Sequence, residues 1–251
     1  ALPPAPFRLT PASRVLTLGS CFAQHIGQHI AAALPDGHAL VNPFGPLYAP
    51  QVIAHHLRLL LDTAPLPDAT YFEGVEGMWH NRWFSTHVSS AEFATCRRLT
   101  TDALSAARDL LRRADVLVLT LGTDRCYRLP DGRLVANCHK QPAATFTEHA
   151  ADVETLTSDL RRALDSLRAR RPELQVVWTV SPYRYAKYGL HASQLAKARL
   201  LLAVDALCAT DERSVYFPAY ELLLDELRDY RYYARDLLHP SDTAVELIGE
   251  R

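Results

Sequence analysis

Short apolar runs alternate with amphipathic stretches along this chain. Residues 15–18 form an apolar run that ends at Gly19-Ser20, and residues 22–33 then carry apolar side chains four apart, which is the spacing of a helix. The same two patterns recur. Strand-length apolar runs lie at 40–41, 115–121, 175–180 and 215–216, and helical stretches lie at 51–61, 100–113, 153–170, 192–209, 218–227 and after 241. Apolar strands separated by helices predict a three-layer α/β fold, a parallel sheet with helices on both faces.

Two segments depart from this alternation. Residues 63–88 contain Pro, Gly and aromatic clusters without a helical period, which predicts a loop or a small hairpin insertion. Asp131-Gly132, flanked by 127–129 and 134–136, predicts a second hairpin. Neither an internal repeat nor a long linker is visible, so we expect residues 1–251 to form one domain.

Polar turns follow several of the expected strands. Gly19-Ser20, residues 42–45, Gly122-Thr123 and Ser181-Pro182 each come directly after an apolar run. In open parallel sheets, ligands bind beyond the carboxyl ends of the strands. We therefore expect these four turns to meet at one rim and to form the functional site.

Composition and charge narrow the classes of partner. Hydrophobic residues make up 48% and charged residues 22%, and the formal net charge is −1, which favours neither nucleic acid nor an anionic membrane surface as partner. No stretch approaches the ~20 apolar residues of a membrane span. Five scattered cysteines without a C-x-x-C pair indicate neither a zinc site nor a disulfide framework, so we expect no metal, reduced thiols and a cytoplasmic location.

Two short motifs carry candidate chemistry. Ser20, between a strand and a helix, could cap the helix through its oxygen or act as a nucleophile. Near the other end, Asp236 precedes His239 by three residues, so the carboxylate can accept from Nδ1 and leave Nε2 free to face a hydroxyl. The plainer interpretation is a solvated carboxylate and a loop histidine. Cys21 is a second candidate nucleophile, disfavoured because its side chain should point away if Ser20 points to the rim.

The motifs together resemble the GSCFA family, a branch related to the SGNH/GDSL hydrolases. The segment Leu18-Gly19-Ser20-Cys21-Phe22-Ala23 carries the resemblance, and further blocks follow it in order as far as about residue 247: Asn42-Pro43-Phe44-Gly45, Thr120-Leu121-Gly122-Thr123, Asn137-Cys138-His139-Lys140, Thr179-Val180-Ser181-Pro182, Tyr216-Phe217-Pro218-Ala219-Tyr220-Glu221, the run from Asp225 to Tyr233, and Asp236-Leu237-Leu238-His239-Pro240. The resemblance implies a flavodoxin-like, SGNH hydrolase-type sheet. It also implies a Ser/His/Asp hydrolase with Ser20, His239 and Asp236 as its triad.

The same resemblance implies an oxyanion hole. Gly45 matches the glycine of the family's second block, and Ser20 would add its own amide. The third block departs from G-x-N-D and has Gly122-Thr123-Asp124, so either Thr123 or Asn137 would replace the missing asparagine. Asn42 and His139 complete the expected substrate-binding residues.

The expected function is therefore that of a serine esterase. It would release a small acyl group, such as acetyl, from a sugar or small metabolite without a metal or organic cofactor. Two alternatives stay open: an O-acyltransferase that uses the same triad, and a non-catalytic ligand-binding domain that keeps the fold.

Overall fold

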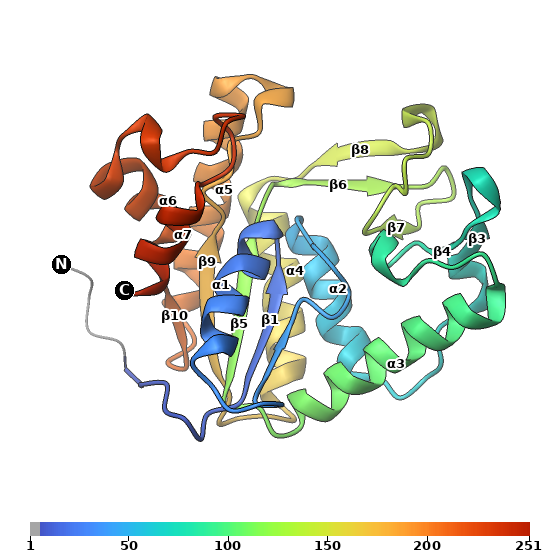
Figure 1. Ribbon diagram of the computed structural model, residues 1–251, viewed down its shortest axis with the longest axis horizontal. Helices are drawn as coiled ribbons and strands as arrows, with labels where there is room; N and C mark the ends of the chain where they lie inside the picture. Colours follow the sequence, from blue (N-terminus) through green and yellow to red (C-terminus); the bar gives the residue numbers. More distant parts are fainter. Residues whose placement is uncertain (1–5) are drawn as a thin grey trace.

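A five-stranded parallel sheet forms the centre of the molecule (Figure 1). The structure, a computed structural model, describes residues 6–251. The strand order is β10-β9-β5-β1-β2, with bounds β1 Val15–Gly19, β2 Ala39–Val41, β5 Val116–Leu121, β9 Gln175–Val180 and β10 Ser214–Tyr216. Numbered among themselves, the five strands follow the doubly wound order 2-1-3-4-5. The expected α/β fold with a central parallel sheet is confirmed.

The two middle strands are buried along their whole length. Every residue of β1 and β5 is shielded from solvent, because helices cover both faces. Such strands need apolar side chains on both sides, which explains their continuous apolar runs. The reversal of strand order falls between β1 and β5, and a crevice is expected at the carboxyl ends of the strands there.

Helices cover both faces of the sheet. On one face α1 contacts α7, and Phe22 packs with Ala244 and Ile248 in a small core of its own. On the other face α2 contacts α4, which contacts α5, over the larger core. The helices are α1 Cys21–Ala32, α2 Pro50–Leu61, α3 Phe93–Leu111, α4 Val153–Arg168, α5 Leu190–Cys208, α6 Ala219–Glu221 and α7 Asp242–Gly249.

Two small antiparallel sheets lie beside the main sheet (Figure 1). The predicted insertion is the hairpin of β3 (Tyr71–Glu73) and β4 (Trp79–Asn81). The predicted Asp131-Gly132 hairpin joins β6 (Arg125–Arg128) to β7 (Leu134–Val135). Sequence analysis did not predict β8 (Thr147–Ala150), which pairs with the other edge of β6.

Tertiary contacts move some of the expected boundaries. Helix α3 begins at Phe93 rather than near Thr100, and the Phe93 ring packs against Trp79 at 4.9 Å between centroids. The expected helix at 218–227 is divided into α6 and a π-helical segment, Leu222–Leu227, that ends at the left-handed residue Arg228. Among residues 6–251, no helix has both the length and the apolar character that are needed to cross a membrane.

Candidate active site

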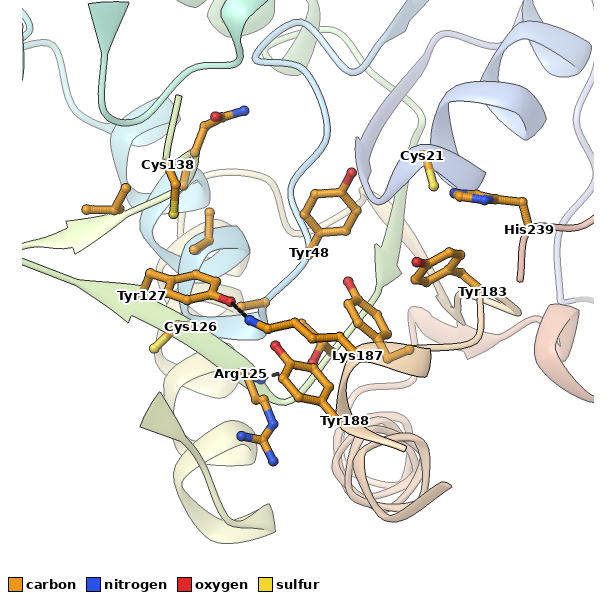
Figure 2. Close-up of a pocket in the computed structure, with 17 residues that line it drawn as sticks. Cys21, Tyr48, Arg125, Cys126, Tyr127, Cys138, Tyr183, Lys187, Tyr188 and His239 are labelled. Atoms are coloured by element: carbon orange, nitrogen blue, oxygen red, sulfur yellow. Dashed lines mark hydrogen bonds between the residues drawn. The ribbon is translucent and has the colours of Figure 1, made fainter. Parts of the chain in front are cut away.

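A cavity of about 350 Å³ opens at the carboxyl ends of β1, β5 and β9 (Figure 2). Its wall contains Cys21 from the start of α1, Thr123 from the turn after β5, and Tyr183 from the turn after β9. His239 closes the side nearest Cys21. Thr123 belongs to one of the four turns expected to meet at one rim, and Cys21 and Tyr183 directly follow two others. The volume is typical of small-molecule sites.

Asp236 and His239 form a tight local pair. The Asp236 carboxylate accepts from His239 Nδ1 at 2.5 Å and from the amides of Leu238 and His239 at 2.9 and 3.0 Å. These hydrogen bonds, with that of the imidazole the largest cause, lower the pKa of Asp236 to about 2. Because Nδ1 is engaged, the other ring nitrogen, Nε2, is the one available for proton transfer in the cavity.

The Tyr183 ring packs against the imidazole, with 4.4 Å between the ring centroids. The main chain of the same turn also contacts the segment that carries the pair, since the Arg184 amide donates to the Leu238 carbonyl at 3.0 Å. The turn after β9 therefore supports the histidine through both a side chain and the main chain.

The structure does not bring the Ser20 hydroxyl to His239. Ser20 is 1% exposed, and among the described residues its Oγ has no hydrogen-bond partner. It is the N-terminal capping residue of α1 by position, yet its side chain makes no capping hydrogen bond. Neither the expected capping hydrogen bond nor a place in the cavity lining is therefore seen for the Ser20 side chain in the described structure.

Cys21 occupies the position expected for Ser20. In Figure 2 its Sγ points toward the imidazole of His239. Burial raises the pKa of the Cys21 thiol, while the amides of Phe22 and Cys21 and the charge of Lys197 lower it. The thiol lies beside the first turn of α1, where backbone N–H groups have no acceptor within the helix.

The amides expected to form the oxyanion hole are already bound to carbonyls. The Ser20 amide donates to Thr120 at 3.2 Å, the Gly45 amide to Asn42 at 2.7 Å, and the Thr123 amide to Tyr48 at 3.1 Å. Each of these hydrogen bonds would have to be shared or broken for the amide to face an oxyanion. The first-turn amides of α1, by contrast, lack acceptors within the helix.

The other expected binding residues fall in three places. Asn137 lines the main cavity with His239. Asn42 and Gly45 line a neighbouring depression that shares Cys21, and Asn42 donates to the Ser20 carbonyl at 3.2 Å. His139 lies in the small sheets, with Nε2 2.9 Å from the Asn81 carbonyl, and burial lowers its pKa to about 4. His139 thus contacts the strand β4 and is not in the described lining of the main cavity, and its role in substrate binding stays a prediction.

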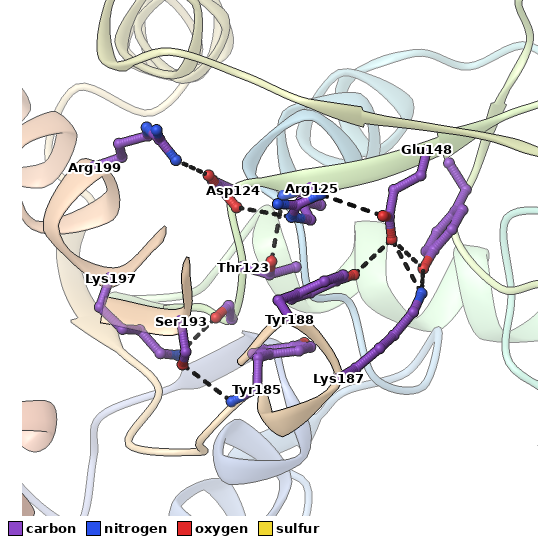
Figure 3. Close-up of polar contacts among 12 residues, drawn as sticks. Thr123, Asp124, Arg125, Glu148, Tyr185, Lys187, Tyr188, Ser193, Lys197 and Arg199 are labelled. Atoms are coloured by element: carbon purple, nitrogen blue, oxygen red, sulfur yellow. Dashed lines mark hydrogen bonds and ion pairs between the residues drawn. The ribbon is translucent and has the colours of Figure 1, made fainter. Parts of the chain in front are cut away.

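Opposite Cys21, the wall is built around Glu148 of β8 (Figure 3). Its carboxylate accepts from the hydroxyls of Tyr127 and Tyr188 at 2.5 and 2.6 Å and from Lys187 at 3.2 Å. Arg125 pairs with it at 3.3 Å. Although partial burial raises the pKa of Glu148, these hydrogen bonds lower it to about 2. The network ties the turn after β9 to the small sheet and so fixes the far wall.

A buried lysine lies behind the cavity (Figure 3). Lys197 of α5 is 1% exposed, and its Nζ donates to the carbonyls of Gly122 and Ser181, both at 2.7 Å. Burial lowers the pKa of Lys197 to about 7, against the opposing charges of Cys21 and Asp124. The two carbonyls end β5 and β9, so this side chain links the strand ends that form the rim.

Sequence analysis missed most of the cavity wall. Five tyrosines line it, from the loop before α2, from β6 and from the turn after β9: Tyr48, Tyr127, Tyr183, Tyr185 and Tyr188. One signal was present, since Ser181-Pro182-Tyr183-Arg184-Tyr185-Ala186-Lys187-Tyr188 places three tyrosines directly after an apolar strand. Burial raises the pKa of Tyr48 to about 12, so its hydroxyl stays protonated.

The fold and the rim site define an open α/β domain with a cavity at the switch point of its sheet. The chain belongs to the GSCFA family, whose model matches residues 14–251. No curated protein matches the sequence. The fold is also similar to the crystal structure of an acetyl esterase, a serine-to-alanine mutant with an acetate ion, at 9% identity and a TM-score of 0.46 over 95% of this chain and 93% of that one.

Proposed function

We propose that this cavity cleaves acyl esters, with His239 as the general base and acid and Asp236 as the group that orients it. The observation that carries the proposal is the 2.5 Å hydrogen bond between His239 Nδ1 and Asp236, on an imidazole that lines the cavity. A carboxylate in this position fixes one tautomer and stabilises the imidazolium that forms during proton transfer. His239 then takes the proton of an attacking group and returns it to the leaving alcohol.

The surroundings support a small, neutral acyl ester. The wall next to His239 is formed by tyrosine rings, and hydroxyls of high pKa can donate to the oxygens of a sugar or other alcohol. The space of about 350 Å³ suits a short acyl chain with its alcohol. Acetyl esters of sugars and small metabolites are therefore the first substrates to test.

The test is hydrolysis of nitrophenyl esters of increasing chain length, followed by a panel of acetylated sugars. We expect the wild type to prefer the acetate, and His239→Ala to lose at least about a hundredfold in kcat/KM. His191→Ala is the matched control, because His191 is exposed at the start of α5, away from the cavity lining. Equal rates for wild type and His239→Ala would contradict the proposal. Binding of acetylated ligands without turnover would favour a binding domain.

Hydrolysis and acyl transfer share the first half of this reaction. Both form an acyl-enzyme, and they differ only in whether water or an alcohol attacks it. Added sugar alcohols that divert the acyl group from water would identify the enzyme as an O-acyltransferase with the same residues.

A further inference from the structure

We propose that the attacking atom of this site is the Sγ of Cys21 and that the acyl-enzyme is a thioester. The proposal rests on the ester-cleaving function proposed above and replaces the serine expected from the sequence. It also predicts thiol chemistry at Cys21 that can be measured without any ester substrate.

The first support is the direction of two neighbouring side chains. The Ser20 hydroxyl is buried, has no hydrogen-bond partner among the described residues, and does not line the cavity. Cys21 is the first helical residue, is partly exposed, and lines the cavity together with His239. Of these two side chains, the one that lines the same cavity as His239 is Cys21 (Figure 2).

The second support is the position of the remaining cysteines. Cys126 and Cys138 also line this cavity, but in Figure 2 both lie across Tyr48 from His239. Cys96 and Cys208 are absent from the described lining. Cys21 is thus the cavity thiol next to the imidazole, and Cys138 provides an internal comparison in the same space.

The third support is the backbone around the sulfur. The amides of Cys21 and Phe22 lie close enough to the thiol to stabilise its anion. Both lower the pKa of Cys21, against the larger effect of burial. An ester carbonyl attacked by Sγ would place its oxygen near the same first turn, where the N–H groups and the helix dipole favour negative charge. The Ser20 amide, by contrast, is bound to the Thr120 carbonyl.

The reaction balances with these groups alone. His239 Nε2 takes the thiol proton as Sγ attacks the carbonyl carbon, and the imidazolium then protonates the leaving alkoxide as the C–O bond breaks. Water attacks the thioester, its proton passes to His239, and the C–S bond breaks to release the carboxylic acid and restore the thiol. Because burial raises the pKa of Cys21, its sulfur rests as the neutral thiol and needs a base to remove its proton.

The experiment traps the acyl-enzyme. Wild-type protein is mixed with nitrophenyl acetate, quenched in acid, and analysed by intact and peptide mass spectrometry. We expect one acetyl group on Cys21, released by neutral hydroxylamine, which cleaves thioesters much faster than oxygen esters. Cys21→Ala should lose the adduct and at least about a hundredfold in kcat/KM. Ser20→Ala should keep both the adduct and most of the rate.

Two further variants show whether lost activity reflects misfolding and whether acetylation of a thiol is unrelated to turnover. Cys21→Ser keeps the size of the side chain, and we expect a slower enzyme whose adduct at position 21 resists neutral hydroxylamine. Cys208→Ser should behave as wild type, because Cys208 is the last residue of α5 and lies outside the cavity lining. An acetyl group on Ser20, or loss of activity in Ser20→Ala with Cys21→Ala fully active, would overturn the proposal.

A second measurement separates this proposal from the proposed function. Iodoacetamide labelling, followed peptide by peptide, compares Cys21 with Cys138 in wild type and in His239→Ala. We expect Cys21 to react faster than Cys138, and to lose that advantage when His239 is removed. If no ester is turned over but Cys21 keeps this His239-dependent reactivity, the ester function fails and the thiol assignment stands. If the reactivity is equal at both cysteines, the thiol assignment fails.

Discussion

Replacing Gly19 by alanine tests whether the close contact between β1 and β5 holds the site together. Gly19 is the last residue of β1, with φ +150°, and it pairs in register with Thr120 of β5. A Cβ added here would lie 2.4 Å from the Thr120 carbonyl oxygen and 2.7 Å from its amide nitrogen. Backbone atoms cannot rotate away, so the two strands would have to separate locally by close to an ångström before the contact became ordinary.

The cost follows from the bonds that this separation breaks. The Ser20 amide donates to Thr120 at 3.2 Å, and the Leu47 amide donates to Gly19 at 2.7 Å. Losing two backbone hydrogen bonds costs about 1 kcal/mol each, and a backbone conformation that L-residues rarely adopt adds about 1–3 kcal/mol. Gly19→Ala should therefore lower the free energy of unfolding by about 3–5 kcal/mol, a large part of the ~5–15 kcal/mol of a typical domain.

Urea unfolding followed by circular dichroism measures this change as a lower midpoint at unchanged slope. Gly37→Ala and Gly132→Ala are matched controls, since both glycines have positive φ (+76° and +84°) but no atom within 4 Å of an added Cβ. They should lose only the ~1–2 kcal/mol of an unfavourable backbone conformation. If Gly19→Ala were no less stable than these controls, the inferred steric clash would be wrong.

Three further changes test the site and its supports. Asp236→Asn should lower kcat by as much as about 10⁴-fold with little effect on KM, because the amide favours the wrong tautomer of His239; steady-state kinetics measure both, and an unchanged kcat would remove Asp236 from the mechanism. Glu148→Gln should weaken hydrogen bonds to charged groups worth about 1.5–3 kcal/mol each and raise KM more than it lowers kcat, and faster proteolysis of the turn after β9 would confirm the loosened wall. Lys197→Met removes a group whose pKa burial lowers from 10.5 to about 7. Above that pH the unfolded chain still binds the proton that the folded chain has lost, so the stability of the wild type should rise relative to the variant, by at most about 1.4 kcal/mol per pH unit up to about pH 10; urea unfolding across this range would contradict it with a flat difference.

The sequence predicts the sheet well because its middle strands are buried on both faces. Continuous apolar runs at β1, β5 and β9 identify those strands, and the turns after them meet at the rim as expected. Strand β8 was missed because its residues, Thr147–Ala150, are mostly exposed and polar, and only pairing with β6 makes them a strand.

The candidate site is predictable where it is local. Asp236 and His239 lie three residues apart, and their pairing needs no distant contact. Which of Ser20 and Cys21 lines the cavity depends on packing at the junction of β1 and α1, which the two neighbouring letters do not specify. The acceptors bound to the Ser20 and Thr123 amides, Thr120 and Tyr48, are distant in sequence, so these contacts too require the folded chain.

The Asp236–His239 pair has a consequence for the proposed ester cleavage. All three hydrogen bonds to the Asp236 carboxylate come from residues within three positions of it, and Ala234 donates to the His239 carbonyl at 2.8 Å. The base is therefore assembled on its own segment, whereas its separation from Cys21 depends on how that segment docks against the turn after β9. The tautomer of His239 and its distance from Cys21 are thus determined by different contacts. A substitution in that turn, far from any reacting atom, would change the approach of the base as a preassembled unit while leaving the imidazole correctly aligned.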